Sequence, residues 1–241
     1  MVCVLADNAD GYDGAHGPCH KVPGPVGGFL GTSYPEGLGG TAPDSLNPAP
    51  PFTFEIWAKR DDDGSSDYLT ALHHYSNAAA GGNQGGFNLY AAPENPELEG
   101  SDLTWQVYVG FGGFPLWDYL VGPPWVRGEW AYLVLTIGVD LIARFYVDGA
   151  IAATGSAPYL VGLPVEWRFG LTLYGGQARG SVAQAAVTPG ARTGAEIAAR
   201  YALREDGAAY VADLLADAPL AYWPLDDCCG SGFAVGAVGM G

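Results

Sequence analysis

The segment Phe52–Arg60 constrains the fold more than any other part of the sequence, because its side chains alternate strictly in character. One set of alternate positions is apolar and holds Phe52, Phe54, Ile56 and Ala58. The other set holds Thr53, Glu55, Trp57 and Lys59. Successive side chains of a β-strand point to opposite faces, so the pattern predicts a strand that turns one face to a core.

Strand-like runs recur along the chain, each bounded by clusters of glycine, proline or asparagine. They cover residues 68–74, 86–91, 103–111, 129–137, 141–147, 150–153, 165–174 and 181–187. A turn at residues 138–140 and the type I′ hairpin signal Asp148-Gly149 together predict three antiparallel strands in a row between residues 129 and 153. With 37 glycines, 18 prolines and only 15% charged residues, the composition favours turns over long amphipathic helices. We therefore predict an all-β fold, an antiparallel two-sheet sandwich.

The pattern changes to that of a helix only near the C-terminal end. Thr193 and Glu196 form a capping-box pattern that opens a predicted helix at residues 195–203, and residues 206–216 predict a second short helix. A strand-like run follows at residues 220–225, and Pro224 assigns it to a sheet edge. The first 50 residues, rich in Gly, Pro, Asn and Asp, predict extended chain with turns.

These elements predict one domain with short additions. An arm at residues 1–22 is followed by the sandwich at 23–192, a short helical segment at 193–218, and a returning edge strand with a Gly-rich tail at 219–241. A chain of 241 residues is long enough to bury a substantial core, and a single all-β sandwich reaches this size.

The charge of the chain excludes two classes of partner. With 26 acidic and 10 basic side chains, a formal net charge of −16, its average surface repels nucleic acid and anionic membranes. No stretch approaches the roughly 20 apolar residues that span a bilayer, and residues 1–6 lack the basic start of a secretion signal. If Met1 is the native start, the chain is expected to fold in a cytoplasm.

Four cysteines lie near the two ends of the chain: Cys3, Cys19, Cys228 and Cys229. Vicinal cysteines rarely bridge each other, so one interpretation joins the N-terminal pair to the C-terminal pair and ties the termini together. Zinc binding with His16 and His20 is a weaker alternative, because no two cysteines have the usual spacing of two to four intervening residues. Free thiols are the third interpretation.

Several segments resemble, in order, the motifs of the concanavalin A-like, laminin G-like domain family. Residues 52–59, FTFEIWAK, resemble its FTxExWxK strand. Residues 129–136, EWAYLVLT, resemble its WxHVxxT strand, and residues 145–149, FYVDG, resemble its LYVDG hairpin. Together with residues 180–201, the resemblance covers about residues 23–201. It implies a jelly-roll sandwich of laminin G-like type.

The resemblance does not carry over a calcium site. Where many relatives have an acidic pair, this chain has Ala183 and Gln184, and where they have an Asp-rich strand it has residues 31–34, GTSY. The turn that holds Asp61, Asp63 and Asp67 is a separate calcium candidate, because Ca²⁺ takes carboxylate oxygens as ligands. We prefer a solvated turn, and so expect no cofactor.

The last apolar segment departs from the chain order of the family. Residues 219–227, PLAYWPLDD, resemble the strand that normally opens such a domain, so the chain resembles a circularly permuted domain or one cut from a tandem array. A missing first strand leaves unpaired backbone groups on a sheet edge. We expect the segment to fold back into its own sandwich; donation to a neighbouring chain is the alternative. The residues that would carry the donation are Leu220, Tyr222, Trp223 and Leu225.

The sequence predicts no enzyme. A jelly-roll glycanase uses two carboxylates about 5 Å apart on one face, and no E-x-D-x-x-E or E-x-D-x-E run is present. Glu55 has no carboxylate neighbour on its own face of the predicted strand. His73 and His74, with Asp67 upstream, point to opposite faces of a strand, so only one of them could enter a site.

A dense group of aromatic residues runs from the predicted strand at 103–111 into a Gly/Pro-rich stretch that predicts a loop. Loops at a sandwich rim often carry function, and aromatic rings suit stacking on sugars or anchoring in a protein interface. Capping of the core is the alternative. The ligand or interface candidates are Trp105, Tyr108, Trp117, Tyr119 and Trp125, with Phe111 and Phe114 between them.

These observations predict a non-catalytic binding or structural module. The leading hypothesis is a structural or surface-decorating protein of a bacteriophage virion, on capsid or tail, whose partners are other virion proteins and further copies of itself. Lysis would take such a protein outside without an export signal. The alternative is an extracellular carbohydrate-binding lectin module, whose partner is a glycan.

Overall fold

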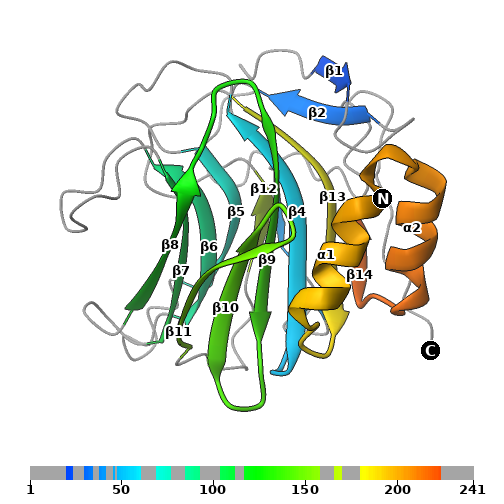
Figure 1. Cartoon of the computed structure of the whole chain (residues 1–241). Helices are drawn as coiled ribbons and strands as arrows, with labels where there is room; N and C mark the ends of the chain where they lie inside the picture. The colour runs from blue at the N-terminus through cyan, green and yellow to red at the C-terminus, as the bar shows by residue number, and fades with distance from the viewer. Residues whose placement is uncertain are drawn as a thin grey trace.

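The computed structural model describes part of the 241-residue chain. The described residues are 20–23, 30–34, 38–41, 46, 48–60, 69–76, 85–92, 104–111, 117–157, 166–169 and 180–223. Within them the molecule is a two-layer sandwich of antiparallel strands, with two helices packed against one outer face (Figure 1). The predicted all-β sandwich with short C-terminal helices is confirmed.

The larger sheet contains eight described strands. Their order is β1 (His20–Pro23), β2 (Leu30–Tyr34), β13 (Gly180–Pro189), β4 (Phe52–Arg60), β9 (Trp130–Ile137), β10 (Ile142–Val147) and β11 (Ala150–Ser156), with β14 (Ala221–Trp223) also paired to β13. The smaller sheet has the order β3 (Leu38–Thr41), β12 (Glu166–Phe169), β5 (Leu69–Ser76), β6 (Gly85–Ala92), β7 (Thr104–Phe111) and β8 (Trp117–Pro124). All pairings between these strands are antiparallel.

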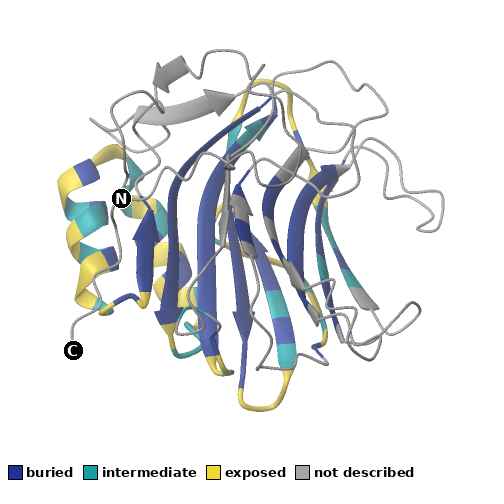
Figure 2. Cartoon of the chain, turned by 180° about the vertical axis from the view of Figure 1, so that it is seen from behind, coloured by how far each residue is buried: buried dark blue, intermediate teal, exposed yellow. Residues whose placement is uncertain are grey.

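The core between the sheets is built from the alternating apolar positions of the strands. Phe52 and Phe54 of β4 are fully buried, and the ring of each lies 5.7 Å from that of Phe87 on β6. Full burial of one such side chain contributes about 1.5–3 kcal/mol, so these contacts between the sheets stabilise the sandwich strongly. Figure 2 shows the buried residues concentrated on the central strands of both layers.

The predicted hairpin between β10 and β11 forms at Asp148 and Gly149. Both have positive φ, 51° and 81°, as a type I′ turn requires. The carboxylate of Asp148 also accepts a hydrogen bond of 2.9 Å from the backbone N–H of Tyr132 on β9. The turn therefore ties three consecutive strands together, as the spacing predicts.

Two helices follow β13, joined by the 3₁₀ turn η3 (Leu203–Glu205). In α1 (Gly194–Ala202), Thr193 and Glu196 form the predicted capping box. In α2 (Gly207–Ala216), the side chain of Asp206 accepts from the backbone N–H of Ala209. Neither of these two described helices is long and apolar enough to cross a membrane.

The last strand folds back onto its own chain. In β14, Ala221–Trp223 pairs with residues 185–187 of β13, and the ring of Trp223 lies 5.3 Å from Trp167 and 5.2 Å from Phe169 in the core. Tyr222 and Trp223, two of the residues considered for donation to another chain, are therefore buried within this one, and Leu220 is 36% exposed. Leu225 lies outside the described residues.

Two predictions about loops are wrong. Strands β1 to β3 form within the first 50 residues, and β8 forms in the stretch predicted to be a loop. In both places Gly and Pro dominate the local signal, whereas pairing with a neighbouring strand decides the outcome: β2 pairs with β13, and β8 pairs with β7. Strand β8 lies at the edge of its sheet, where such residues are tolerated better than in central strands.

Candidate functional site

The outer faces of the two sheets differ in what covers them. Helices α1 and α2 lie on the larger sheet, where a second apolar cluster joins strands and helices. Its buried members are Trp57, Tyr132, Val134, Tyr146, Ala183, Ala186, Ile197, Tyr210, Leu214 and Tyr222. Neither described helix lies on the outer face of the smaller sheet (Figures 1 and 2). Both faces contain buried polar side chains, and each is a candidate site.

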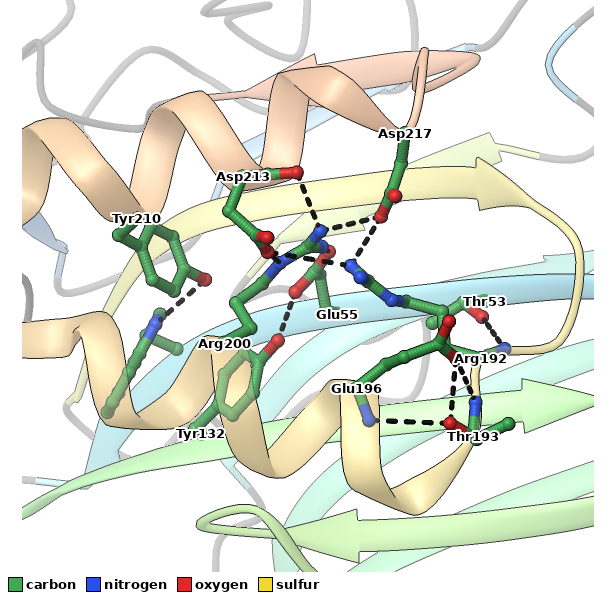
Figure 3. Close-up of polar contacts among 11 residues, drawn as sticks. Thr53, Glu55, Tyr132, Arg192, Thr193, Glu196, Arg200, Tyr210, Asp213 and Asp217 are labelled. Atoms are coloured by element: carbon green, nitrogen blue, oxygen red, sulfur yellow. Dashed lines mark hydrogen bonds and ion pairs between the residues drawn. The ribbon is translucent and has the colours of Figure 1, made fainter.

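Under the helices, Glu55 and Arg200 form a buried ion pair (Figure 3). Glu55 is 1% exposed and accepts hydrogen bonds from Nη1 of Arg200 and from the hydroxyl of Tyr132. Arg200 also donates from Nε to the carboxylate of Asp213 at 2.7 Å and from Nη2 to that of Asp217 at 2.6 Å. A sheet residue is thereby joined to both helices.

The charges of this network follow from its burial. Burial raises the pKa of Glu55 above its ordinary value, although Arg200 and the Tyr132 hydroxyl act in the opposite direction. Burial by itself would lower the pKa of Arg200, but Glu55 and the neighbouring acidic groups raise it overall, so Arg200 stays charged. Burial also raises the pKa of Tyr132 and Tyr210.

The Glu55 network is a structural feature, because its groups are engaged with one another and its central pair, Glu55 and Arg200, is buried, whereas Asp213 and Asp217 lie at its exposed rim. Tyr210 accepts a hydrogen bond of 3.1 Å from the indole of Trp57, and Arg192 adds an ion pair with Asp217. Arg200 itself has no exposed side-chain surface. The arrangement joins the helices to the sandwich and leaves Glu55 out of reach of a substrate.

The outer face of the smaller sheet is set by alternation along its strands. In β6, Phe87, Leu89 and Ala91 enter the core, so Asn88 and Tyr90 take the outward positions. In β7, Trp105, Val107 and Val109 enter the core, which leaves Thr104, Gln106 and Tyr108 outward. Amide, hydroxyl and phenol groups thus occupy neighbouring strands on one face.

Three tyrosine rings are packed edge to face on this surface. The rings of Tyr90 and Tyr108 lie 5.1 Å apart and those of Tyr108 and Tyr119 lie 4.2 Å apart. Tyr90 is 9% exposed, whereas Tyr108 and Tyr119 are half-buried. Such pairs hold aromatic rings in defined orientations.

Two buried amides on this face differ in their hydrogen bonding. Gln106 donates from Nε2 to Thr104 at 3.0 Å and accepts from the hydroxyl of Tyr108 at 3.4 Å. Asn88, 5% exposed, has an Oδ1 atom that accepts no hydrogen bond within the described part of the chain. Buried polar atoms are rarely left without a partner. Among the described residues, Thr136, Gln184 and Thr188 of the larger sheet share this feature, and Asn88 has it on the face that neither described helix covers.

The strand register aligns these residues across the whole sheet. Arg168 of β12 pairs with His73 of β5, His73 with Asn88, Asn88 with Tyr108, and Tyr108 with Tyr119 of β8. The neighbouring row on the same face lies two positions before Asn88 on β6. There Gly86 pairs with Gly110, and Gly110 pairs with Trp117. We call this surface the Asn88 face, defined by Asn88, Tyr90, Thr104, Gln106, Tyr108 and Tyr119.

The structure separates the predicted aromatic candidates. Tyr108 and Tyr119 lie on the Asn88 face, whereas Trp105 is 2% exposed in the core. Trp125 is 9% exposed, and the guanidinium of Arg60 lies 4.6 Å from its ring centroid. Trp105 and Trp125 therefore serve packing, as the core alternative expected. Trp117 lies in β8.

Other predicted site residues lie outside the described residues: Cys3, Cys19, Cys228, Cys229, Asp61, Asp63, Asp67 and Phe114. Disulfide pairing and calcium binding therefore stay predictions. No group of three or more His, Cys, Asp or Glu that could hold a metal occurs in the part of the chain that the structure describes. Of the two histidines, His74 is fully buried and its ring stacks on Trp167 at 3.8 Å.

Sequence reasoning missed the most informative residues of both faces. Asn88, Tyr90 and Gln106 were not predicted, although the alternation in residues 86–91 and 103–111 places them opposite the apolar positions. The partners of Glu55, Tyr132 and Arg200, lie 77 and 145 residues further along the chain, and no local sequence pattern reveals contacts over such separations. Only the packing of α1 onto β4 brings Arg200 to Glu55.

The two antiparallel sheets with their short C-terminal helices define a β-sandwich protein. A family model described as the concanavalin A-like lectin/glucanases superfamily matches residues 38–198. The chain therefore belongs to this superfamily, and the resemblance drawn from its motifs is confirmed. A search of curated proteins finds no match.

Solved structures share the fold at low sequence identity. Domain 4 of a GH43 extracellular arabinanase from Geobacillus stearothermophilus, solved with arabinotriose, has a TM-score of 0.55 and 14% identity, over 76% of this chain and 81% of that one. The binding domain of botulinum neurotoxin serotype G has a TM-score of 0.56 and 8% identity, over 82% of this chain and 48% of that one. Trypanosoma rangeli sialidase has a TM-score of 0.50 and 16% identity, over 78% of this chain and 28% of that one. The chain thus spans less than half of the toxin and sialidase chains, and these similarities concern the fold.

Proposed function

We propose that this chain is a non-catalytic carbohydrate-binding module and that the Asn88 face is its binding surface. The observation that carries the proposal is the placement of three tyrosine rings beside two buried amides, on a sheet face that neither described helix covers. Sugars offer apolar C–H faces and a rim of hydroxyls. Aromatic rings with a few oriented polar groups match both features.

The comparisons support a glycan as the ligand class. One of the similar structures is an arabinanase domain in complex with arabinotriose, and that enzyme is described as extracellular. The family of this chain is named for lectins as well as glucanases. An extracellular or surface location fits a module that meets glycans.

The chemistry of the described carboxylates favours binding over hydrolysis. Glycoside hydrolysis uses two carboxyl groups that flank the sugar bond. Glu55, the fully buried carboxylate of the larger sheet, lies under the helices and is paired with Arg200. The described side chains of the Asn88 face are amides, phenols and a hydroxyl, which bind sugars without cleaving them.

A glycan array followed by calorimetry tests this proposal. We expect the wild-type chain to bind at least one oligosaccharide, and Tyr108→Ala and Tyr119→Ala each to weaken binding about tenfold or more, which is about 1.4 kcal/mol. Tyr201→Ala is the matched control, because Tyr201 is also a half-buried tyrosine but stacks on Trp57 under the helices. It should bind like the wild type.

Two results would contradict the proposal in different ways. Absence of binding to every glycan on the array would refute the function. Loss of binding in Tyr201→Ala, with Tyr108→Ala unaffected, would move the binding surface to the other face of the sandwich.

A role in decorating a bacteriophage virion stays a prediction about where such a module acts. The fold and the comparisons do not bear on it, and it rests on sequence reasoning alone. Co-purification of the chain with phage particles, on capsid or tail, would support it.

A further inference from the structure

Asn88 sits at a position that the fold alone does not favour. It lies mid-strand in β6, where asparagine is a poor strand former, and its Oδ1 atom is buried without a donor in the described residues. A buried acceptor that loses its water and gains no protein donor lowers stability. On a sheet face that neither described helix covers, a ligand can supply the donor that this acceptor lacks.

The same face shows that it can satisfy a buried amide. Gln106 is 1% exposed, one strand away, and both ends of its amide are engaged, with Thr104 and with Tyr108. The difference between the two amides is therefore local. It points to Asn88 as the position kept for a ligand.

The surroundings of Asn88 indicate what that ligand must bring. An amide oxygen accepts hydrogen bonds, so it selects a donor and repels the oxygens of carboxylate, sulfate or phosphate groups. The net charge of −16 opposes acidic ligands as well. Beside Asn88 and Tyr108, the paired Gly86 and Gly110 add no side chain to the face.

We infer that Asn88 determines specificity for a neutral sugar, with its Oδ1 accepting a hydrogen bond from a sugar hydroxyl. This inference rests on the proposed carbohydrate-binding function. Tyr108 is the neighbour of Asn88 in the register and is half-buried. The Oδ1 atom of Asn88 is itself buried, so binding requires a shift of the side chains that cover it. The Tyr108 ring next to it then offers a flat apolar contact to the C–H face of the sugar.

Replacement by valine tests the inference through two readouts that change in opposite directions. In Asn88→Val, removal of the unpaired oxygen and the gain of a good strand former should raise the Tm of the free protein by about 2–4 °C. Calorimetry should show at least a tenfold loss of affinity for the neutral oligosaccharide that the wild type binds best. A residue with a purely structural role would lower the Tm instead.

Gln106→Val is the matched control for stability. It replaces an equally buried amide that is fully engaged, so it should lower the Tm because Thr104 and Tyr108 lose their partner. A rise in the Tm of Gln106→Val similar to that of Asn88→Val would overturn the contrast on which the inference depends.

The remaining outcomes distinguish the specificity role of Asn88 from the proposed carbohydrate-binding function. If the wild type binds neutral glycans and Asn88→Val binds them equally well, the inference is wrong and the proposed function stands. The inference is also overturned if the wild type prefers sialylated or uronic-acid glycans to neutral ones. Failure of the wild type to bind any glycan removes both.

Discussion

The two outer faces of this sandwich bury similar polar groups and pair them differently. Beneath the helices, Glu55 is paired with Arg200 and Tyr132, and Arg200 with Asp213 and Asp217. On the Asn88 face, Gln106 is engaged while the oxygen of Asn88 is not. The Glu55 network is paired throughout, although Thr136, Gln184 and Thr188 elsewhere on the larger sheet each have a buried atom that is unpaired within the described residues. The unpaired oxygen of Asn88 differs from these because it lies on a sheet face that neither described helix covers.

The difference has a physical origin in what covers each sheet. A buried carboxylate is tolerated only with a charged and hydrogen-bonded partner, and the helices supply that partner to Glu55. An uncharged amide is less costly to leave unpaired, so a binding face can retain one. The faces can therefore be tested by making equivalent changes in both.

The largest effect is expected from Arg200→Met. It leaves Glu55 buried beside the helices without its cation, so the free energy of unfolding should fall by about 3–5 kcal/mol in urea denaturation. Glycan binding by the folded protein should stay unchanged. The double variant Glu55→Gln with Arg200→Met should recover part of the loss, because no lone charge remains. A loss below about 1 kcal/mol would mean that water reaches Glu55.

The next-largest effect on the free energy of unfolding is expected when one tyrosine hydroxyl is removed from each face. Tyr132→Phe removes the hydroxyl that donates to buried Glu55 and should lower the free energy of unfolding by about 1.5–3 kcal/mol. Tyr108→Phe removes a long bond of 3.4 Å near the surface and should change it by less than about 0.5 kcal/mol. Urea denaturation of both variants checks the contrast. Equal losses would show that the two faces are not distinct in stability.

A smaller loss is expected at the start of α1. Thr193→Ala removes the capping oxygen that accepts from the backbone N–H of Glu196 and should lower the free energy of unfolding by about 1 kcal/mol. Thr193→Ser retains the oxygen and should stay close to the wild type in thermal unfolding. If Thr193→Ser lowers the stability as much as Thr193→Ala, loss of the capping hydrogen bond does not explain the effect of Thr193→Ala.

The smallest effect is a slope of stability with pH. Because burial raises the pKa of Glu55, the folded chain holds that proton at pH values where the unfolded chain has lost it. The stability that Glu55 contributes is therefore fully present below pH 4.5, the ordinary pKa of a glutamate, and is lost as the pH rises through the higher pKa of Glu55 in the folded chain. Glu55→Gln should lack this fall, which is at most about 1.4 kcal/mol per pH unit.

Glu196 provides a control of opposite sign for the pH measurement. Its pKa is lowered by hydrogen bonds from the backbone and side chain of Thr193, so its contribution is lost as the pH falls. Glu196→Gln should flatten the acid side of the stability curve and leave the slope above pH 4.5 in place. Identical curves for the wild type and Glu55→Gln would contradict the assignment to Glu55.

Local patterns predicted those parts of the fold whose cause is local. The alternation in Phe52–Arg60, the turn at Asp148-Gly149 and the capping box at Thr193 all appear where they were expected. Strand β8 was missed because its signal is mixed with Gly and Pro, and its pairing with β7 decides the outcome. Among the aromatic candidates, Tyr108 and Tyr119 reached the surface while Trp105 entered the core.

By itself, the sequence determined the fold class, the family and most strand positions, because alternation and turn residues act over a few neighbours. Only the tertiary structure decided which polar residues meet: Arg200 reaches Glu55 across 145 positions, and the register aligns Asn88 with Tyr108. Contacts of that kind depend on how sheets and helices are layered. A one-dimensional pattern does not contain that information, so the Asn88 face became visible only in three dimensions.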